Sequence, residues 1–445
     1  MENGRYLTSF LEISVETDLN LSNLALLDNA AQGTYYHEYL HYIQDITTCS
    51  GLCKIWRAFD CLRQLISSIQ PNDVIDVNAP MDNAVATEQK RHLDFLETLR
   101  GSGQIRGISI ELADSYNIVE VLEEKNPLIL DYYANSSATA IKLRLQSPLP
   151  ETREKHFTFG ENAVSETMAY LVERKFYPDL QALPRYPYKV ATDLVHHLYP
   201  DLVACDEIIF SLCDASLLYN MPGWAFSQII RRMAAQNIVP INGREVIDFA
   251  YSFYDEIEWN HNEYSRYAIQ SIQFISDALY GHNYYTATKD LLQASVERGM
   301  LIRQENPYFL VDIFTQNQPL SPEFYMTFNF LGGPLSINNN GGRWVRVPLG
   351  MEALQDMADP SHFRVAWQLS KFLLEAERPC SLIRCCRSAD NRNIDHRCEH
   401  SPWQRVNDEN GCPYAAAWAL YGFHKKDFYL NGVLIQQRSE DVLPE

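Results

Sequence analysis

The sequence predicts an α+β protein that is predominantly helical, and two observations indicate this fold class. Apolar residues recur every three to four positions in many stretches, and between about 188 and 299 this helical pattern is nearly continuous. Short runs of β-forming residues between polar turns gather at about 104–159 and return between 308 and 350. With 445 residues, 46% of them apolar, the chain is long enough for two or three domains with large cores.

These changes of pattern divide the chain into three predicted regions. The first spans residues 1–180 and contains a β-rich insertion at about 104–159. The second, residues 181–300, is expected to be all-helical. The third, residues 301–445, is expected to be mixed α/β and to end in a cysteine-rich tail at 380–412.

The first hundred residues are expected to form a strand at 7–15 and then three helices. The first helix has an apolar stripe at helical spacing, made of Tyr36, Leu40, Ile43 and Ile46. Thr34 is its expected N-cap. Two further amphipathic helices are expected at 52–69 and 84–100.

The β-rich region is expected to contain four short strands, at 105–110, 118–122, 128–130 and 140–145. A strand end at 156–160 leads directly into a helix expected over 161–175. Further along, the turn sequence at 338–342 before residues 343–347 predicts a hairpin. Residues 351–377 are expected to be helical again.

The most specific motif is an HExxH pattern formed by His37, Glu38 and His41. Histidines four residues apart lie on the same face of a helix, so both imidazoles can reach one Zn²⁺ ion. Glu38 would then lie beside the metal, within reach of a water that the metal activates, and is the candidate general base. The alternative is a buried helix whose two histidines are satisfied core residues.

A catalytic zinc takes three protein ligands, so a third must come from elsewhere in the chain. In the helix expected at 161–175, Glu166 lies between apolar positions and should face inward. A metal would compensate an inward carboxylate, which is costly without a partner. Glu161 and Glu173 are the alternative ligands, and a salt-bridged or surface carboxylate is the alternative role for Glu166.

The motif at 37–41, together with the downstream sequence Ser-Glu-Thr-Met-Ala at 165–169, resembles the gluzincin branch of the zincin metallopeptidases. The resemblance implies a zincin-like catalytic core within residues 1–180, with an edge strand beside the motif helix that holds a peptide substrate in extended form. It also implies that His37, His41 and Glu166 are the zinc ligands. In the same way it implies that Glu38 is the general base.

The expected activity is that of a zinc metallopeptidase, a hydrolase that cleaves peptide bonds of a protein substrate with a zinc-activated water. Glu38 would take the proton of that water and pass it to the leaving nitrogen.

Gln44 and Asp45 are candidate partners of a ligand imidazole, with a solvated helix face as the alternative. A second electrophile is expected among His261, Tyr264, His282, Tyr284 and Tyr285. Two alternative functions stay open: a zinc hydrolase of a non-peptide amide, and a non-catalytic helical interaction or scaffold protein.

Charge and hydropathy restrict the partners and the compartment. The net charge of −20 disfavours binding to nucleic acid or to an anionic membrane surface. No stretch approaches the ~20 apolar residues that span a bilayer, and the first residues do not form a secretory signal. We therefore expect a cytoplasmic protein whose partners are a protein or peptide substrate and, through its additional regions, a regulatory protein.

Five cysteines gather in the tail: Cys380, Cys385, Cys386, Cys398 and Cys412. His396 and His400 lie among them. In a reducing compartment this density indicates either a second metal site, with structural zinc preferred, or a group of unligated thiols. An iron–sulfur cluster and a thiol redox switch are further alternatives.

Overall fold

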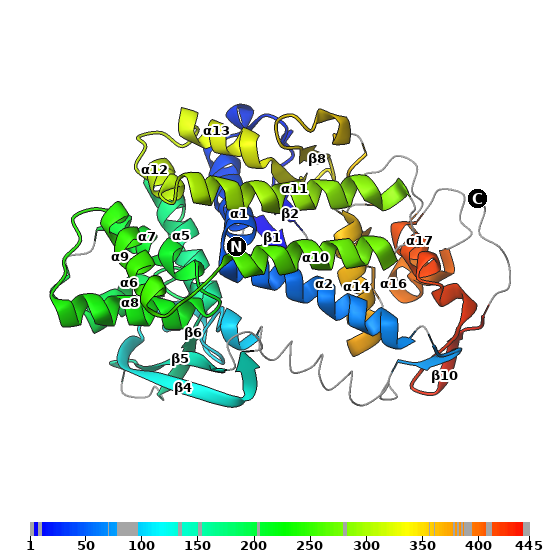
Figure 1. Ribbon diagram of the computed structural model, residues 1–445, viewed down its shortest axis with the longest axis horizontal. Helices are drawn as coiled ribbons and strands as arrows, with labels where there is room; N and C mark the ends of the chain where they lie inside the picture. Colours follow the sequence, from blue (N-terminus) through cyan, green and yellow to red (C-terminus); the bar gives the residue numbers. More distant parts are fainter. Residues whose placement is uncertain are drawn as a thin grey trace.

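The protein is an α+β fold in which helices predominate, as seen in a computed structural model (Figure 1). The structure describes the chain except for residues 1–3, 8–10, 70, 78–96, 132–135, 150–153, 203–204, 279–282, 356, 360, 377–378, 381, 384–385, 387–393, 406–411 and 439–445. None of the helices in the described part is long and apolar enough to cross a membrane.

The helices lie in the following order: α1 Asn29–Thr47, α2 Cys49–Ile69, α4 Ile110–Ala113, α5 Glu161–Phe176, α6 Val190–Leu198, α7 Asp206–Leu217, α8 Pro222–Gln236, α9 Gly243–Glu256, α10 Asn262–Ala278, α11 Asn283–Glu305, α12 Phe309–Phe314, α13 Pro322–Leu331, α14 Ser361–Glu375, α16 Arg397–His400 and α17 Pro413–Leu420. The strands are β1 Gly4–Leu7, β2 Glu12–Val15, β3 Val74–Asp76, β4 Asn117–Asp131, β5 Ser136–Gln146, β6 Lys155–Phe159, β7 Gly333–Ile337, β8 Arg343–Arg346, β9 Asp427–Leu430 and β10 Val433–Gln436.

The strands form three small sheets. One has the order β1-β2-β7-β8, with β2 and β7 parallel and the other pairs antiparallel. The second is the antiparallel sheet β4-β5-β6, and the third has the order β10-β9-β3. The pairing of β2 with β7 joins the first of the three predicted regions to the last. The predicted region boundaries at residues 180 and 300 stay a prediction.

Helix α1 is central, with α2, α5, α11 and the four-stranded sheet packed around it (Figure 1). The predicted apolar stripe is confirmed, because each of its members is at most 4% exposed: Tyr36, Leu40, Ile43 and Ile46. The predicted N-cap is wrong: the helix begins after Asp28, whose side chain accepts a hydrogen bond from the backbone N–H of Ala31, and Thr34 lies inside it. The HExxH motif at 37–41 therefore lies wholly within a regular helix.

Several other predicted elements are confirmed. They are the helices α2, α5 and α14, the helical middle from α6 to α11, strand β5, strand β6 and the hairpin of β7 with β8. The helix expected at 84–100 lies largely outside the described residues, of which only 97–100 are helical.

Two predictions about the strands are wrong, and two others are confirmed only in part. The strand expected at 7–15 is two antiparallel strands, β1 and β2, and Leu11 between them has a φ of 49°. The run at 105–110 forms no strand and leads into α4. The runs at 118–122 and 128–130 belong to the single strand β4, which pairs with β5 on both sides of a register shift between Asn126 and Leu130. Between 308 and 350, the helices α12 and α13 precede the strands.

A buried ion pair ties the end of α1 to the helical middle. Arg303 on α11 donates from both terminal nitrogens to the Asp214 carboxylate on α7, at 2.8 and 2.9 Å. One of these nitrogens also donates to the hydroxyl of Thr47, the last residue of α1, at 3.3 Å. The two charged side chains are 1% and 0% exposed, so this pair lies wholly inside the core.

Candidate metal centre

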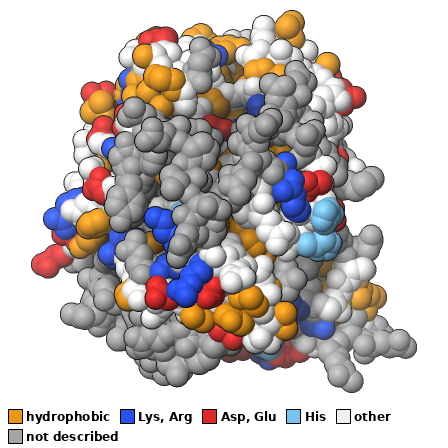
Figure 2. All heavy atoms as spheres, turned by 90° about the vertical axis from the view of Figure 1, so that its right-hand side faces the viewer, with side chains coloured by type: hydrophobic (Ala, Val, Ile, Leu, Met, Phe, Trp, Pro, Cys, Tyr) orange, Lys and Arg blue, Asp and Glu red, His pale blue; other side chains and the backbone are white. Residues whose placement is uncertain are grey.

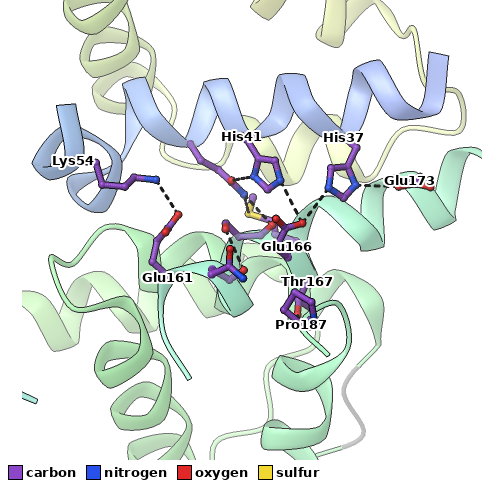
Figure 3. A network of polar contacts seen from close by, with 12 residues as sticks. His37, His41, Lys54, Glu161, Glu166, Thr167, Glu173 and Pro187 are labelled. Carbon is purple, nitrogen blue, oxygen red and sulfur yellow. Dashed lines mark hydrogen bonds and ion pairs between the residues drawn. The ribbon is translucent and has the colours of Figure 1, made fainter. Parts of the chain in front are cut away.

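The predicted site residues of α1 and α5 meet where these two helices pack against each other. His37 and His41 point from α1 toward Glu166 on α5 (Figure 3). The Glu166 carboxylate lies 3.2 Å from Nε2 of His37 and 3.5 Å from Nε2 of His41. One ligand atom of each residue lies within 4.8 Å of the others, the only such grouping of three metal-ligating side chains within the described residues. The structure thus brings together the three residues predicted as ligands.

Each imidazole is held on its far side by a hydrogen-bond acceptor. His37 Nδ1 donates to the Glu173 carboxylate at 2.9 Å, and His41 Nδ1 donates to the Gln44 side-chain oxygen at 2.8 Å. The Gln44 amide nitrogen in turn donates to the sulfur of Met168, which orients the amide. A neutral imidazole that keeps its proton on Nδ1 would direct the lone pair of Nε2 into the gap toward Glu166, where a metal ion could bind it. Metal-binding histidines show this arrangement, in which an acceptor fixes the tautomer and the ring orientation.

The electrostatics of the site also fit a divalent cation. Burial raises the pKa of Glu166, but the neighbouring His41 and His37 outweigh it and hold the pKa well below its usual range. Three carboxylates, of Glu38, Glu166 and Glu173, thus surround two imidazoles in a mostly buried space. In addition, the buried Nε2 of His41 makes no well-formed hydrogen bond. A dication would satisfy this nitrogen and compensate the surplus negative charge, and two His with one Glu is a known zinc ligand set.

Glu38 lies beside the three ligands and is 8% exposed. Its carboxylate accepts a hydrogen bond from the backbone N–H of Tyr6 on β1. Burial raises its pKa, and His37 and His41 only partly oppose this effect. A carboxylate with a raised pKa holds a proton more readily than an ordinary glutamate, as a general base requires.

A second polar network adjoins the site and anchors β1 and α5 to α1. Lys54 on α2 pairs with Asp45 at 2.7 Å. It also pairs with Glu161 at 2.9 Å (Figure 3). The hydroxyl of Tyr6 donates to the other oxygen of Asp45 at 2.9 Å. Burial lowers the pKa of Lys54, but its two carboxylate partners raise it well above the ordinary value. Lys54 is therefore a fixed positive charge that positions the elements on both sides of the metal centre.

These contacts decide the roles of the alternative residues. Glu161 is bound to Lys54, and Glu173 supports His37, so neither stands with the ligand group. Gln44 orients an imidazole as predicted, whereas Asp45 serves Lys54 and Tyr6 instead.

The predicted second electrophiles do not lie at the site where the structure describes them. His261 lies near Arg303, and Tyr264 accepts a hydrogen bond from Asn220. Neither is among the described residues that line the cleft. His282 and the side chains of Tyr284 and Tyr285 lie outside the described part. The aromatic hydroxyls at the cleft belong to Tyr6 and Tyr188.

The candidate metal centre opens into a cleft of about 780 Å³. Its walls come from β1, α1, α5 and the segment 180–189 that follows α5. A cleft of this size accommodates a ligand of several residues. Within the described residues, strand β1 is the outer strand of its sheet, and the backbone N–H of its residue Tyr6 donates to the Glu38 carboxylate. This outer strand packs against the motif helix α1.

No protein-family model matches the chain, and neither a curated protein nor a solved structure shows significant similarity to it.

Removal of the Glu173 support should weaken metal binding without removing a ligand. We expect Glu173→Ala to raise the dissociation constant for Zn²⁺ by about 10–100-fold, because loss of an acceptor behind a ligand histidine has this effect. Glu173→Gln keeps an acceptor oxygen and should lose less. Competition titration with a chromogenic chelator measures both, with the exposed neighbour variant Arg174→Ala as control. Equal zinc affinity of Glu173→Ala and wild type would show that this contact does not orient a ligand.

Proposed function

We propose that the chain is a zinc-dependent peptidase in which His37, His41 and Glu166 hold the ion and Glu38 is the general base. The observation that carries this proposal is the convergence of the three ligand atoms within 4.8 Å. Support comes from the acceptors behind both histidines and from the buried carboxylate of Glu38 next to them. A satisfied pair of core histidines would need neither the third carboxylate nor an open cleft in front of it.

A bound zinc ion would supply an activated water and would polarise the scissile carbonyl. With the ion bound, Glu38 would accept a proton from the attacking water and deliver it to the leaving nitrogen. The N–H of Tyr6 holds the Glu38 carboxylate in place, and Lys54 holds Tyr6 through Asp45. Gln44 and Glu173 keep the imidazoles oriented during these steps.

The shape of the cleft favours a peptide over a small amide as substrate. An extended peptide can lie along β1, the outer strand of its sheet in the described part, beside the ligand helix α1. A cleft of about 780 Å³ also exceeds what a single small amide group needs. We propose a cytoplasmic location as well, in keeping with the free thiols of Cys61, Cys205, Cys213, Cys380, Cys398 and Cys412.

Metal analysis of purified protein tests whether His37, His41 and Glu166 bind zinc, on which the proposal depends. Relative to wild type, His41→Ala and Glu166→Ala should each lose about one zinc per chain. Digestion of a peptide library should then show cleavage by the wild type that a chelator abolishes and added zinc restores. Zinc binding with hydrolysis of small amides only would favour the non-peptide amidase. Unchanged zinc content in both variants would overturn the metal centre and leave the scaffold interpretation.

A further inference from the structure

The cleft in front of the candidate metal centre contains cations that have no carboxylate partner. Four Lys and Arg residues line it: Arg5, Lys54, Arg100 and Lys189. Lys54 forms the two ion pairs described above. In the described part of the chain, none of the other three makes an ion pair with a carboxylate, although acidic residues outnumber basic ones by 57 to 37.

The acidic groups of the same cleft are already bound within the protein. Glu166 and Glu173 lie 3.2 and 2.9 Å from the first histidine of the motif. The Asp114 carboxylate accepts a hydrogen bond from the backbone N–H of Arg185 at 2.7 Å, and two further carboxylates are paired with Lys54. An incoming carboxylate would therefore meet unpaired cations, whereas an incoming cation would meet acceptors that are already engaged.

The surface at the α17 end of the molecule shows a different pattern. In Figure 2, Lys and Arg side chains on this face lie beside Asp and Glu side chains. Arg397, for example, pairs with Asp395 at 2.7 Å. A cation next to a carboxylate is largely neutralised, so the cations of the cleft are better able to attract an acidic ligand.

The chain around Arg100 is fixed against the start of α5. Gly101 has a φ of 73°, and the backbone N–H of Ser102 donates to the carbonyl oxygen of Thr158 at 2.8 Å. The N–H of Thr158 donates back to the Ser102 hydroxyl at 3.1 Å. Gly160, the N-cap of α5, packs so closely here that an added Cβ would lie 2.9 Å from the carbonyl group of Arg100. Arg100 is therefore held beside the first turn of α5.

Lys189 is held near the other end of the metal centre by aromatic side chains. Its ammonium lies 5.4 Å from the centre of the Tyr170 ring on α5, within the range of a cation–π interaction. The Tyr188 ring lies 6.3 Å from that of Tyr170 and 6.2 Å from the imidazole of His37, measured between ring centroids. These contacts place Lys189 on the His37 side of the cleft.

The two cations lie on opposite sides of Glu166 along α5. Arg100 adjoins Gly160, six positions before Glu166, and Lys189 contacts Tyr170, four positions after it. Ten positions correspond to about 15 Å along a helix, a distance that about four residues of an extended peptide cover. A peptide in the cleft could thus reach both cations while its central bond lies at the metal centre.

We propose that the cleft selects acidic peptides, with Arg100 and Lys189 binding carboxylate side chains on either side of the cleaved bond. This inference rests on the proposed peptidase function and names its substrate class. The Arg100 guanidinium can bind a carboxylate through two parallel hydrogen bonds, and the Lys189 ammonium acts as a point charge. Arg5 on β1 adds a third positive charge to the wall of the cleft.

Peptide binding to the full chain tests this proposal without relying on hydrolysis. The probes are fluorescein-labelled octapeptides with blocked ends that carry two Glu, two Gln or two Lys residues four positions apart. The protein is Glu38→Gln with added zinc, which should bind peptides without cleaving them. We expect the Glu peptide to bind about 5–25-fold more tightly than the Gln peptide, as two partly exposed ion pairs would allow. In 1 M salt, where the Debye length is about 3 Å, most of this preference should disappear.

Charge reversal assigns the preference to the two cations. Arg100→Glu and Lys189→Glu, each added to Glu38→Gln, should each lower the preference for the Glu peptide about fivefold and strengthen binding of the Lys peptide. A gain in Lys-peptide binding cannot result from a folding defect. The matched control is Lys425→Glu, at an exposed lysine that does not line the cleft, which should leave the preference unchanged.

Several results would overturn the acidic-peptide proposal. They are equal binding of the three peptides, tighter binding of the Gln or Lys peptide, no binding of any of them, and a preference that survives both charge reversals. Failure of the peptidase proposal looks different: no peptide of the library is cleaved in a chelator-sensitive way, while the charge preference in binding persists. Hydrolysis without preference for acidic sequences would leave the peptidase in place and remove only the substrate class.

Discussion

Glu38→Gln is expected to lower peptide hydrolysis by about 10²–10⁴-fold while the zinc content stays that of the wild type. Glutamine has nearly the same shape and can still accept the hydrogen bond from the Tyr6 N–H. It cannot take a proton from water at neutral pH, so only the proton-transfer step is lost. Initial rates on a peptide identified from the library digest, together with metal analysis of the same sample, measure both effects.

The matched control is Glu256→Gln on α9, an exposed glutamate paired with Arg232 away from the cleft. It should have the activity of the wild type within a factor of about two. Full activity of Glu38→Gln would rule out Glu38 as the base, even if the metal centre itself is confirmed. Loss of zinc in Glu38→Gln would instead show that Glu38 belongs to the ligand set.

Helical periodicity was sufficient to predict how the two ligand helices face each other. His37 and His41 are one turn apart on α1, and Glu166 faces them from the buried side of α5. Glu166 and Glu173 are seven residues apart and therefore lie on the same face of α5. Periodicity alone could not decide which of them reaches the metal. Packing decides it: Glu166 lies opposite both imidazoles, and Glu173 lies on the far side of His37.

Contacts between distant segments are the part that the sequence did not reveal. Tyr6 reaches Asp45 across 39 positions, and Lys54 reaches Glu161 across 107. No local pattern signals such contacts, because they depend on how β1 and α2 pack against α1. The hairpin of β1 with β2 was missed for a related reason. Residues 7–15 alternate weakly like one strand, and nothing in their residue types signals the positive φ of Leu11, which directly precedes β2.

Arg303→Met is expected to lower the free energy of unfolding by about 3–5 kcal/mol. The variant leaves the Asp214 carboxylate, 0% exposed, without its charged partner inside the core. It also removes the donor to Thr47 at the end of α1. Chemical denaturation followed by tryptophan fluorescence measures the change. The control is Arg244→Met, whose partner Asp312 lies at the surface, where loss of an ion pair costs about 0–1 kcal/mol.

The double variant Arg303→Met/Asp214→Leu separates the two causes of this loss. If the uncompensated charge dominates, the double variant should regain most of the stability, because apolar residues of similar size can replace a buried ion pair. If the hydrogen bond to Thr47 dominates, the double variant should stay as unstable as Arg303→Met. Its zinc affinity should then also decrease, because the end of α1 would be less well ordered. A loss below about 1 kcal/mol in Arg303→Met would contradict both, and would mean that water reaches Asp214 in the folded protein.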